Sequence, residues 1–375
     1  MSAMRFVPLS AVLHRVAVGQ PLVLNVYDTD GSLLLSKGTT VDTPTQLDAL
    51  ASRGVQVDLE EVPERLEVAA HVPRDMLPAL WQDATNRVLG LLHNQPLTRI
   101  NEALSEACQP LEVLIRRDPD LAIVNAVRNG LDDRRTYGVL QSMYAAVVSM
   151  LIATRLGWAA SEVTAAGKTA LAMNVSIFKL LGSLALRRAA PSADERQVLR
   201  AHPIRSRELL VEAGVRDRDL LLAVEQHHER ADGTGYPGGI KAVADLAALV
   251  RCADAFVTGL HDYSGPGSQA PDQLLKRLFL QEERNMFVAA LVKEMGIYPP
   301  GCVVDLANGE QCLVIRRGAS INSPVVAAIP NATKRQFGEA ALRDTTLAQH
   351  RIVRVVHPSD HLIGKSQMVT MLRAQ

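Results

Sequence analysis

The stretch HHERADGTGYPGG, residues 227–239, decides how this 375-residue chain is interpreted. Two adjacent histidines stand at the expected end of a helix, and Gly233, Gly235 and Pro237 then impose a non-helical turn. Neighbouring side chains on a helix point roughly 100° apart, so an adjacent pair more often gives one core and one surface histidine. At a helix end, the same pair can turn towards one metal ion. Whether the two histidines are separate or share a metal ion depends on what other residues the chain provides.

Composition excludes several classes of protein. The chain has 40 basic and 40 acidic side chains and a formal net charge of zero, which gives no electrostatic basis for binding a nucleic acid polymer. Only 4% of residues are aromatic, so base-stacking platforms are not expected. The most apolar run, residues 144–154, ends at Arg155 and is typical of a buried helix. We therefore expect no membrane span, and a cytoplasmic protein.

The first 65 residues predict a small α/β module. Two strands flank the turn Asp28-Thr29-Asp30-Gly31, because Asp-Gly between alternating apolar residues favours a hairpin. A short helix over 43–54 and a closing strand over 55–62 follow. The acidic segment after this strand marks the end of the module.

Helical periodicity dominates residues 73–296, and β patterns return over 297–375. The C-terminal extension carries a hairpin around Asn308-Gly309 and short strands near 324–329 and 350–356. The predicted fold is therefore mainly α, with a helical bundle between two small β-containing parts. Apolar residues at i, i+3, i+4 and i+7 predict helices over 75–92, 98–115, 137–157, 160–181, 193–214, 217–229, 246–260 and 268–296.

The opening stretch closely resembles the signature of the HD-GYP family, whose usual form is HHE, two residues, DG, one residue, GYP. This family is a branch of the HD metal-dependent phosphohydrolases, all-α bundles that hydrolyse the bacterial messenger cyclic di-GMP at a two- or three-metal centre. The resemblance runs from about Tyr137 to Arg316 and includes the C-terminal hairpin. The N-terminal module also resembles one often placed before such domains. The resemblance implies an HD-type helical bundle in a bacterial signalling protein.

Four metal-ligand positions of the family are retained. His202 stands in the family's HP context, His227 and His228 match its adjacent histidines, and Asp254 in RCADAF matches its late aspartate. The resemblance also implies a loop that contacts a ligand or a signalling partner, formed by Asp232, Gly233, Gly235, Tyr236 and Pro237.

The namesake His-Asp pair of the family is missing. Its histidine and aspartate are replaced by Met173 and Asn174, its lysine by Ile177, and an earlier histidine by Gln141. Two cations would lose the carboxylate that bridges them, because the Asn174 amide is neutral. The Met173 thioether is a poor ligand for iron, manganese or magnesium. These changes together indicate a degenerate active site.

Our leading hypothesis is a pseudoenzyme of the phosphodiesterase type that binds cyclic di-GMP, a related nucleotide or a signalling protein without hydrolysis. The alternative is a phosphodiesterase with a reduced site, in which the three histidines hold one metal. We expect no tightly bound cofactor and at most one weakly bound divalent transition metal. A set of arginines either forms a basic rim for phosphates or, as we favour, a solvated helix face: Arg187, Arg188, Arg196, Arg200, Arg205 and Arg207.

Overall fold

A computed structural model describes residues 6–9, 18–19, 22, 25–58, 77–93, 99–128, 136–187, 190–261, 270–282, 285–329 and 341–356. The chain divides into two compact units, Met1–Pro78 and Ala79–Gln375. The second unit holds most of helix α3 (Leu77–His93), the helices after it and the C-terminal β extension, and the domain boundaries expected from the sequence stay a prediction.

The described residues of the first unit form a four-stranded antiparallel sheet and the helix α1. The strand order is β1-β4-β2-β3, with β1 at Phe6–Pro8, β2 at Val26–Tyr27, β3 at Leu33–Leu35 and β4 at Gln56–Asp58. Helix α1 spans Pro44–Ser52, and the hydroxyl of Thr43 accepts a hydrogen bond from the backbone N–H of Gln46 at its start. The β2–β3 hairpin and α1 confirm the predicted mixed character of this segment. Strand β1 was not predicted.

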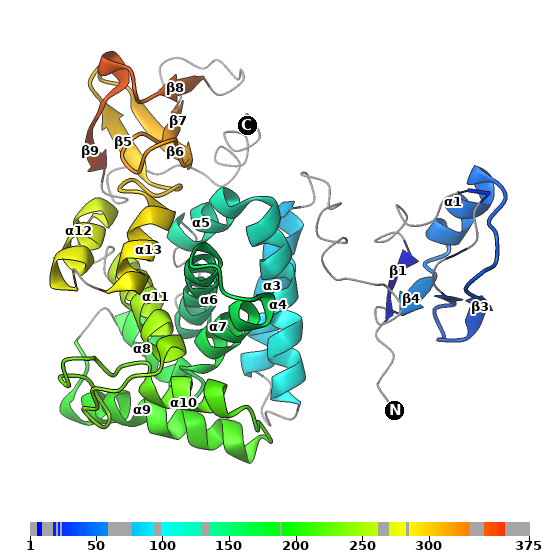
Figure 1. Cartoon of the computed structure of the whole chain (residues 1–375), viewed down its shortest axis with the longest axis horizontal. Coiled ribbons are helices and arrows are strands. Elements are labelled where there is room, and N and C mark those ends of the chain that lie inside the picture. Colours follow the sequence, from blue (N-terminus) through cyan, green and yellow to red (C-terminus); the bar gives the residue numbers. More distant parts are fainter. Residues whose placement is uncertain are drawn as a thin grey trace. The chain divides into compact units, whose positions relative to one another are not determined.

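The second unit is mainly helical, as expected for an HD-type fold (Figure 1). Helix α6 is the central helix of this unit and packs against α7 and α11. Its helices are α3 (Leu77–His93), α4 (Ile100–Arg117), α5 (Pro119–Arg128), α6 (Tyr137–Arg155), α7 (Ala160–Ala172), α8 (Phe178–Arg187), α9 (Ala193–Glu212), α10 (Arg218–Gln226), α11 (Asp245–His261), α12 (Pro271–Gln281) and α13 (Met286–Met295).

Helix α6 is buried on nearly all sides because other helices surround it, and its side chains are mostly apolar. By length and composition it passes as a membrane span, the one such helix in the described residues, but 83% of its most apolar window is buried inside the protein. Burial of this kind is typical of the core helix of a globular bundle.

Two predicted helices are each divided in the structure. The helix expected over 160–181 stops after Ala172, and residues 173–177 form turns before α8 begins. The helix expected over 268–296 is divided into α12 and α13, and Asn285 caps α13 by accepting hydrogen bonds from the N–H groups of Phe287 and Val288. Apolar periodicity continues across both breaks, which is why the pattern alone did not reveal them. Helix α5 was not predicted.

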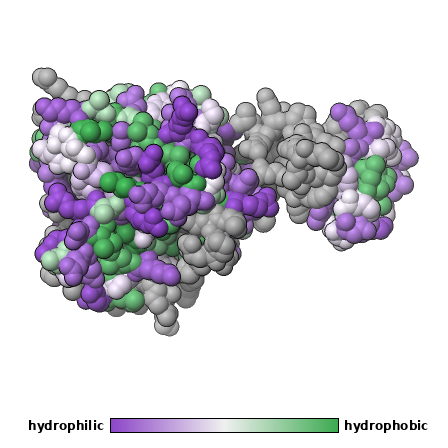
Figure 2. Space-filling view, turned by 90° about the horizontal axis from the view of Figure 1, so that it is seen from below, coloured by the Kyte–Doolittle hydropathy of each residue, from purple (hydrophilic) through white to green (hydrophobic). Residues whose placement is uncertain are grey.

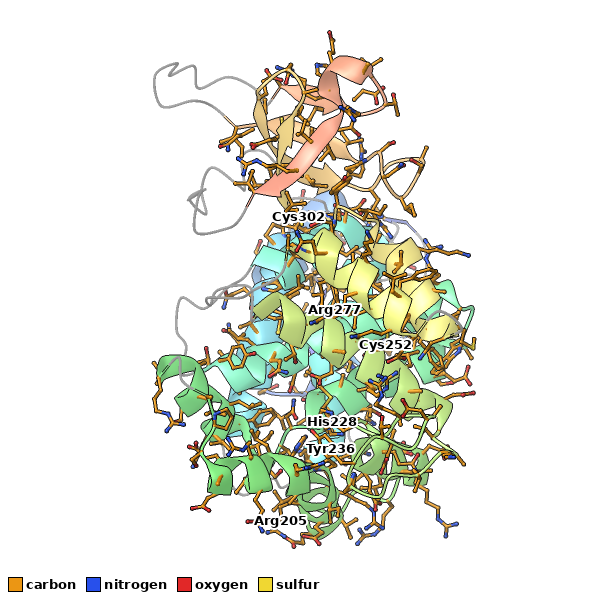
Figure 3. All side chains as sticks on the ribbon, turned by 90° about the vertical axis from the view of Figure 1, so that its left-hand side faces the viewer. Arg205, His228, Tyr236, Cys252, Arg277 and Cys302 are labelled. Atoms are coloured by element: carbon orange, nitrogen blue, oxygen red, sulfur yellow. The ribbon has the colours of Figure 1, made fainter. Side chains whose placement is uncertain are left out.

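The C-terminal part is a five-stranded antiparallel sheet in the order β8-β7-β6-β5-β9. Its strands are β5 (Val303–Leu306), β6 (Gln311–Arg316), β7 (Val325–Ala328), β8 (Leu342–Asp344) and β9 (Ile352–Val356). Arg317, just after β6, forms ion pairs with Asp120 of α5 and Glu294 of α13. These ion pairs connect the sheet to one end of the helical bundle. Helices α9 and α10 lie at the opposite end (Figures 1 and 3).

Candidate metal and ligand site

His202 is oriented by the proline that follows it. Pro203 has no N–H group, so the carbonyl oxygen of Leu199, four residues earlier in α9, receives no helical hydrogen bond from it. The ring nitrogen Nδ1 of His202 lies 2.6 Å from that oxygen. A carbonyl only accepts, so Nδ1 carries the proton and Nε2 presents a lone pair. The His-Pro pair therefore fixes both the tautomer and the direction of the ligating nitrogen.

His227 is oriented in the same way by the end of α10. Its Nδ1 lies 2.6 Å from the carbonyl oxygen of Val224, one of the last carbonyls of the helix and hence without a helical partner. The Nε2 atom of His227 consequently also presents a lone pair, and it lies 3.0 Å from Nε2 of His202. His228 completes the group, with its ring centroid 4.2 Å from that of His227.

The three histidines fit one metal ion. Their ligating atoms lie within 4.8 Å of one another. Two nitrogens bound at about 2.0–2.1 Å to one ion stand roughly 2.9–3.4 Å apart, which includes the 3.0 Å between His202 and His227. Backbone carbonyls that hold the other ring nitrogen are the usual outer contacts of metal-binding histidines. Without a cation, two lone pairs would face each other at hydrogen-bond distance.

Burial keeps these imidazoles neutral, the form that ligates metals. It lowers the pKa of His202 to about 4 and that of His227 to about 3, and the charge of His202 acts in the same direction on His227. The pKa of His228 is also well below its usual value because of burial, followed by the nearby charges of the other two histidines and Arg251.

Asp254 lies near the group but is held by another contact. It stands on α11, buried, and one of its carboxylate oxygens accepts a hydrogen bond from Nε2 of Gln141 at 3.0 Å. Gln141 also donates to the hydroxyl of Thr258 at 2.8 Å, and its own Oε1 has no hydrogen-bond partner among the described residues. Burial raises the pKa of Asp254 to about 6, and the hydrogen bonds from Gln141 and Thr258 oppose that shift. Within the described residues, the cluster at ligating distance consists of the three histidines and does not include Asp254.

The residues at the expected His-Asp positions lie in the turn between α7 and α8. Met173 and Asn174 are both buried there, and Ile177 is buried next to α8. The turn packs against α9, because the hydroxyl of Ser176 donates to the carbonyl oxygen of His202 at 3.2 Å. This turn therefore reaches the histidine group without bringing a carboxylate to it.

Glu229 organises the loop after the histidines, a role the sequence did not reveal. Its buried carboxylate accepts hydrogen bonds from the backbone N–H groups of Gly238 (2.5 Å), Gly239 (3.1 Å) and Ile240 (3.1 Å). These three hydrogen bonds hold the end of the loop, residues 238–240, against its beginning at Glu229. The only sequence signal was an acidic residue beside a run of glycines, whose free amides need an acceptor.

Gly235 and Tyr236 bring an aromatic ring onto the group. A side chain at Gly235 would place its Cβ 2.5 Å from Cα of Glu229 and 2.6 Å from the carbonyl oxygen of His228, so only glycine fits. Tyr236 then stacks on His228, with ring centroids 4.5 Å apart and planes 20° apart. Figure 3 shows the two side chains one beneath the other at the α9–α10 end of the bundle. Asp232 and Thr234 form an exposed turn at the tip of the loop.

A cavity of about 420 Å³ adjoins His202 on the side of the 173–177 turn. Its lining is largely apolar, because Ile177, Val198 and Ile204 face it. Figure 2 looks onto this end of the unit and shows apolar surface among charged side chains. His202 therefore borders an apolar pocket, and His228 contacts the Tyr236 ring.

Comparison with known proteins identifies the domain. Residues 126–257 match the family model of an HD domain, and this range contains all three histidines of the group. The chain is 23% identical over 311 residues to the cyclic di-GMP phosphodiesterase PA4108 of Pseudomonas aeruginosa, covering 80% of this chain and 73% of that protein. It is 29% identical over 167 residues to the cyclic di-GMP phosphodiesterase response regulator RpfG of Xanthomonas campestris, covering 43% of this chain and 40% of that protein.

A solved structure, the HDG"Y"P protein Bd1817 of Bdellovibrio bacteriovorus, is 16% identical and covers 77% of this chain and 98% of its own, with a TM-score of 0.46. Residues 126–257 are an HD domain, and the two phosphodiesterase relatives together with the HHE–DG–GYP loop support the HD-GYP family.

Proposed function

We propose that this protein is a signalling protein that binds cyclic di-GMP at the histidine group and does not hydrolyse it. The observation that carries the proposal is the ligand set: three histidines meet, and no carboxylate joins them among the described residues. Hydrolysis of a phosphodiester by paired metals needs negative ligands to hold two cations a few Å apart. Neutral imidazoles suit one late transition ion such as zinc or nickel.

The hydrogen bond between Gln141 and Asp254 supports this role. The carboxylate that the family would offer to a metal is here engaged by a neutral amide. Met173 and Asn174 stand nearby in the turn against α9 and add no charge. His202, His227 and His228 would supply three ligands to a single ion, which would then have room to accept a phosphate oxygen. The two relatives act on cyclic di-GMP by name, and this makes that nucleotide the first ligand to test.

The second candidate is hydrolysis at a one-metal site. The 3.0 Å separation of the His202 and His227 Nε2 atoms favours it, because a preformed single-metal site also lowers the pKa of bound water. Docking of a signalling protein on the loop around Tyr236 stays a prediction from the family resemblance. The cytoplasmic location is likewise a proposal.

Binding and turnover are separable in one experiment. Protein dialysed against zinc, nickel, manganese or iron is titrated with cyclic di-GMP by calorimetry, and the same mixtures are analysed for linear dinucleotide and GMP. We expect saturable binding with no product above background. Product release that is abolished by His228→Ala would instead establish the one-metal hydrolase. Absence of binding under every metal condition would remove the nucleotide role altogether.

A further inference from the structure

Arg200 stands at the outer end of a column of side chains that leads to the histidine group. It is an exposed residue of α9, and its guanidinium carbon lies 5.8 Å from the centroid of the Tyr236 ring. That ring stacks on His228 at 4.5 Å, and His228 lies 5.0 Å from His202, centroid to centroid. A cation held against an aromatic face keeps its N–H groups available. The column therefore places an available cation beside the candidate ligand site.

The other described arginines of α8 and α9 are engaged elsewhere. Each has a hydrogen-bond or ion-pair partner, whereas Arg200 has only its contact with the Tyr236 ring within the described part of the chain. The partners are Glu195 for Arg187, the carbonyl oxygen of Pro191 for Arg196, Glu208 and Glu212 for Arg205, and Glu225 for Arg207. Arg188 lies outside the described residues; among the described members of the arginine set that the sequence could not subdivide, the structure thus selects Arg200.

The acidic side chains around the loop do not neutralise Arg200. Glu225 pairs with Arg207 from α10, and the Glu229 carboxylate is occupied by backbone amides. Asp232 lies 3.5 Å from Arg230, and Glu282 is paired with Arg251 through two hydrogen bonds. Asp254 is buried and hydrogen-bonded to Gln141. Each of these described carboxylates has its own partner, so the charge of Arg200 beside the Tyr236 ring remains available to a ligand.

From this arrangement we propose that Arg200 is the phosphate-contacting residue of the ligand site and binds a phosphodiester group of the cyclic dinucleotide. The inference rests on the proposed function, and it names the part of the ligand and the residue that recognises it. The guanidinium fork matches two phosphate oxygens at once, and Tyr236 holds it in position. The lysine that the family resemblance would place in this region is Ile177, which offers no charge. Arg200 supplies a positive charge from α9 instead.

The test compares two arginines one helical turn apart. Arg200→Ala and Arg196→Ala remove the same charge from exposed positions of α9, but the Arg196 side chain contacts a backbone carbonyl and not Tyr236. Binding of cyclic di-GMP to metal-loaded full-length protein is measured by calorimetry, with thermal melts to check folding. We expect Arg200→Ala to weaken binding by roughly tenfold or more and Arg196→Ala by less than about threefold. Arg200→Lys should be intermediate, because an ammonium keeps the charge without the fork.

Each outcome has a defined meaning. Wild-type binding that is unchanged in Arg200→Ala overturns the inference and leaves the proposed function standing. Equal losses in the two alanine variants also overturn it, because they indicate a general effect of charge. If the wild type hydrolyses the nucleotide and Arg200→Ala loses affinity, the non-hydrolytic proposal fails and the role of Arg200 holds. A wild type that binds neither cyclic di-GMP nor the linear dinucleotide overturns both.

Discussion

Replacing Glu229 with glutamine should open the loop that carries Tyr236. The carboxylate accepts three backbone hydrogen bonds, from Gly238, Gly239 and Ile240. Glutamine keeps one oxygen, so the bonds from Gly238 and Gly239 become neutral ones. Its NH₂ group then faces the N–H of Ile240, donor against donor, in a place where the side chain is only 2% exposed.

The expected cost follows from these three bonds. A hydrogen bond to a charged group contributes about 1.5–3 kcal/mol and a neutral one about 0.5–1.5 kcal/mol. Even at the lower ends of these ranges, losing one charged bond and weakening two others destabilises the closed loop by at least about 3 kcal/mol. This corresponds to roughly 150-fold more frequent opening. The loop is a local structure, so global unfolding is the less direct measure.

Native-state hydrogen exchange of the 238–240 amides measures this opening directly. The matched control is Asp232→Asn, because Asp232 lies on the exposed tip of the same loop and its Oδ1 acceptor is kept. We expect roughly 150-fold faster exchange in Glu229→Gln and a change of less than about fivefold in the control. Unchanged exchange in Glu229→Gln would show that the three hydrogen bonds do not hold the loop, and the reasoning would be refuted.

Three further predictions concern the site and the C-terminal sheet. Equilibrium dialysis against zinc should give one bound ion per chain and none after His227→Ala; two or more ions in the wild type would contradict the three-histidine set. Gly235→Ala should lower the melting temperature and abolish nucleotide binding, since its Cβ would lie 2.4–2.6 Å from three backbone atoms of residues 228–230; an unaltered melt would mean that the loop can shift freely. Hydrogen bonding to Arg343 lowers the pKa of Glu310 to about 2, so the pair stabilises the fold above about pH 4.5 and loses this contribution as the pH falls towards 2. Arg343→Met should therefore cost about 1 kcal/mol at pH 7, a value reduced for solvent screening, and progressively less below pH 4.5; urea titrations showing a pH-independent cost would disprove this.

The helical architecture could be predicted from the sequence because long amphipathic segments carry a repeated signal. The breaks in these segments could not. Residues 173–177 continue the apolar pattern, yet the helix stops there. The N–H of Ser176 is directed at the hydroxyl of Ser206, on a helix some 30 residues further along the chain. A tertiary contact of this kind leaves no local trace in the pattern, and short elements such as β1 and α5 have too few residues to show a period.

The candidate site was predictable only in part. The family resemblance named His202, His227 and His228, and the structure brings them together. It did not indicate how they are oriented, because that depends on the carbonyl oxygens of Leu199 and Val224. The resemblance placed Asp254 among the metal ligands. In the structure its carboxylate accepts a hydrogen bond from Gln141, and this contact could not be predicted because the two residues are 113 positions apart in the sequence. The hydrogen-bond donor that a buried carboxylate contacts is determined by the tertiary structure.

That hydrogen bond also explains why the departures from the family pattern occur together. A buried carboxylate is costly unless a cation or a hydrogen-bond donor compensates it. In a two-metal site the cations supply that compensation for the late aspartate. Under the proposed function Asn174 in place of the bridging aspartate holds no second cation, and Asp254 then needs a hydrogen-bond donor instead. Gln141 provides one, with Thr258 on the same helix as the aspartate. The change at Gln141 thus stabilises the site without a second metal, and reversing Asn174 to aspartate alone should not restore a paired centre.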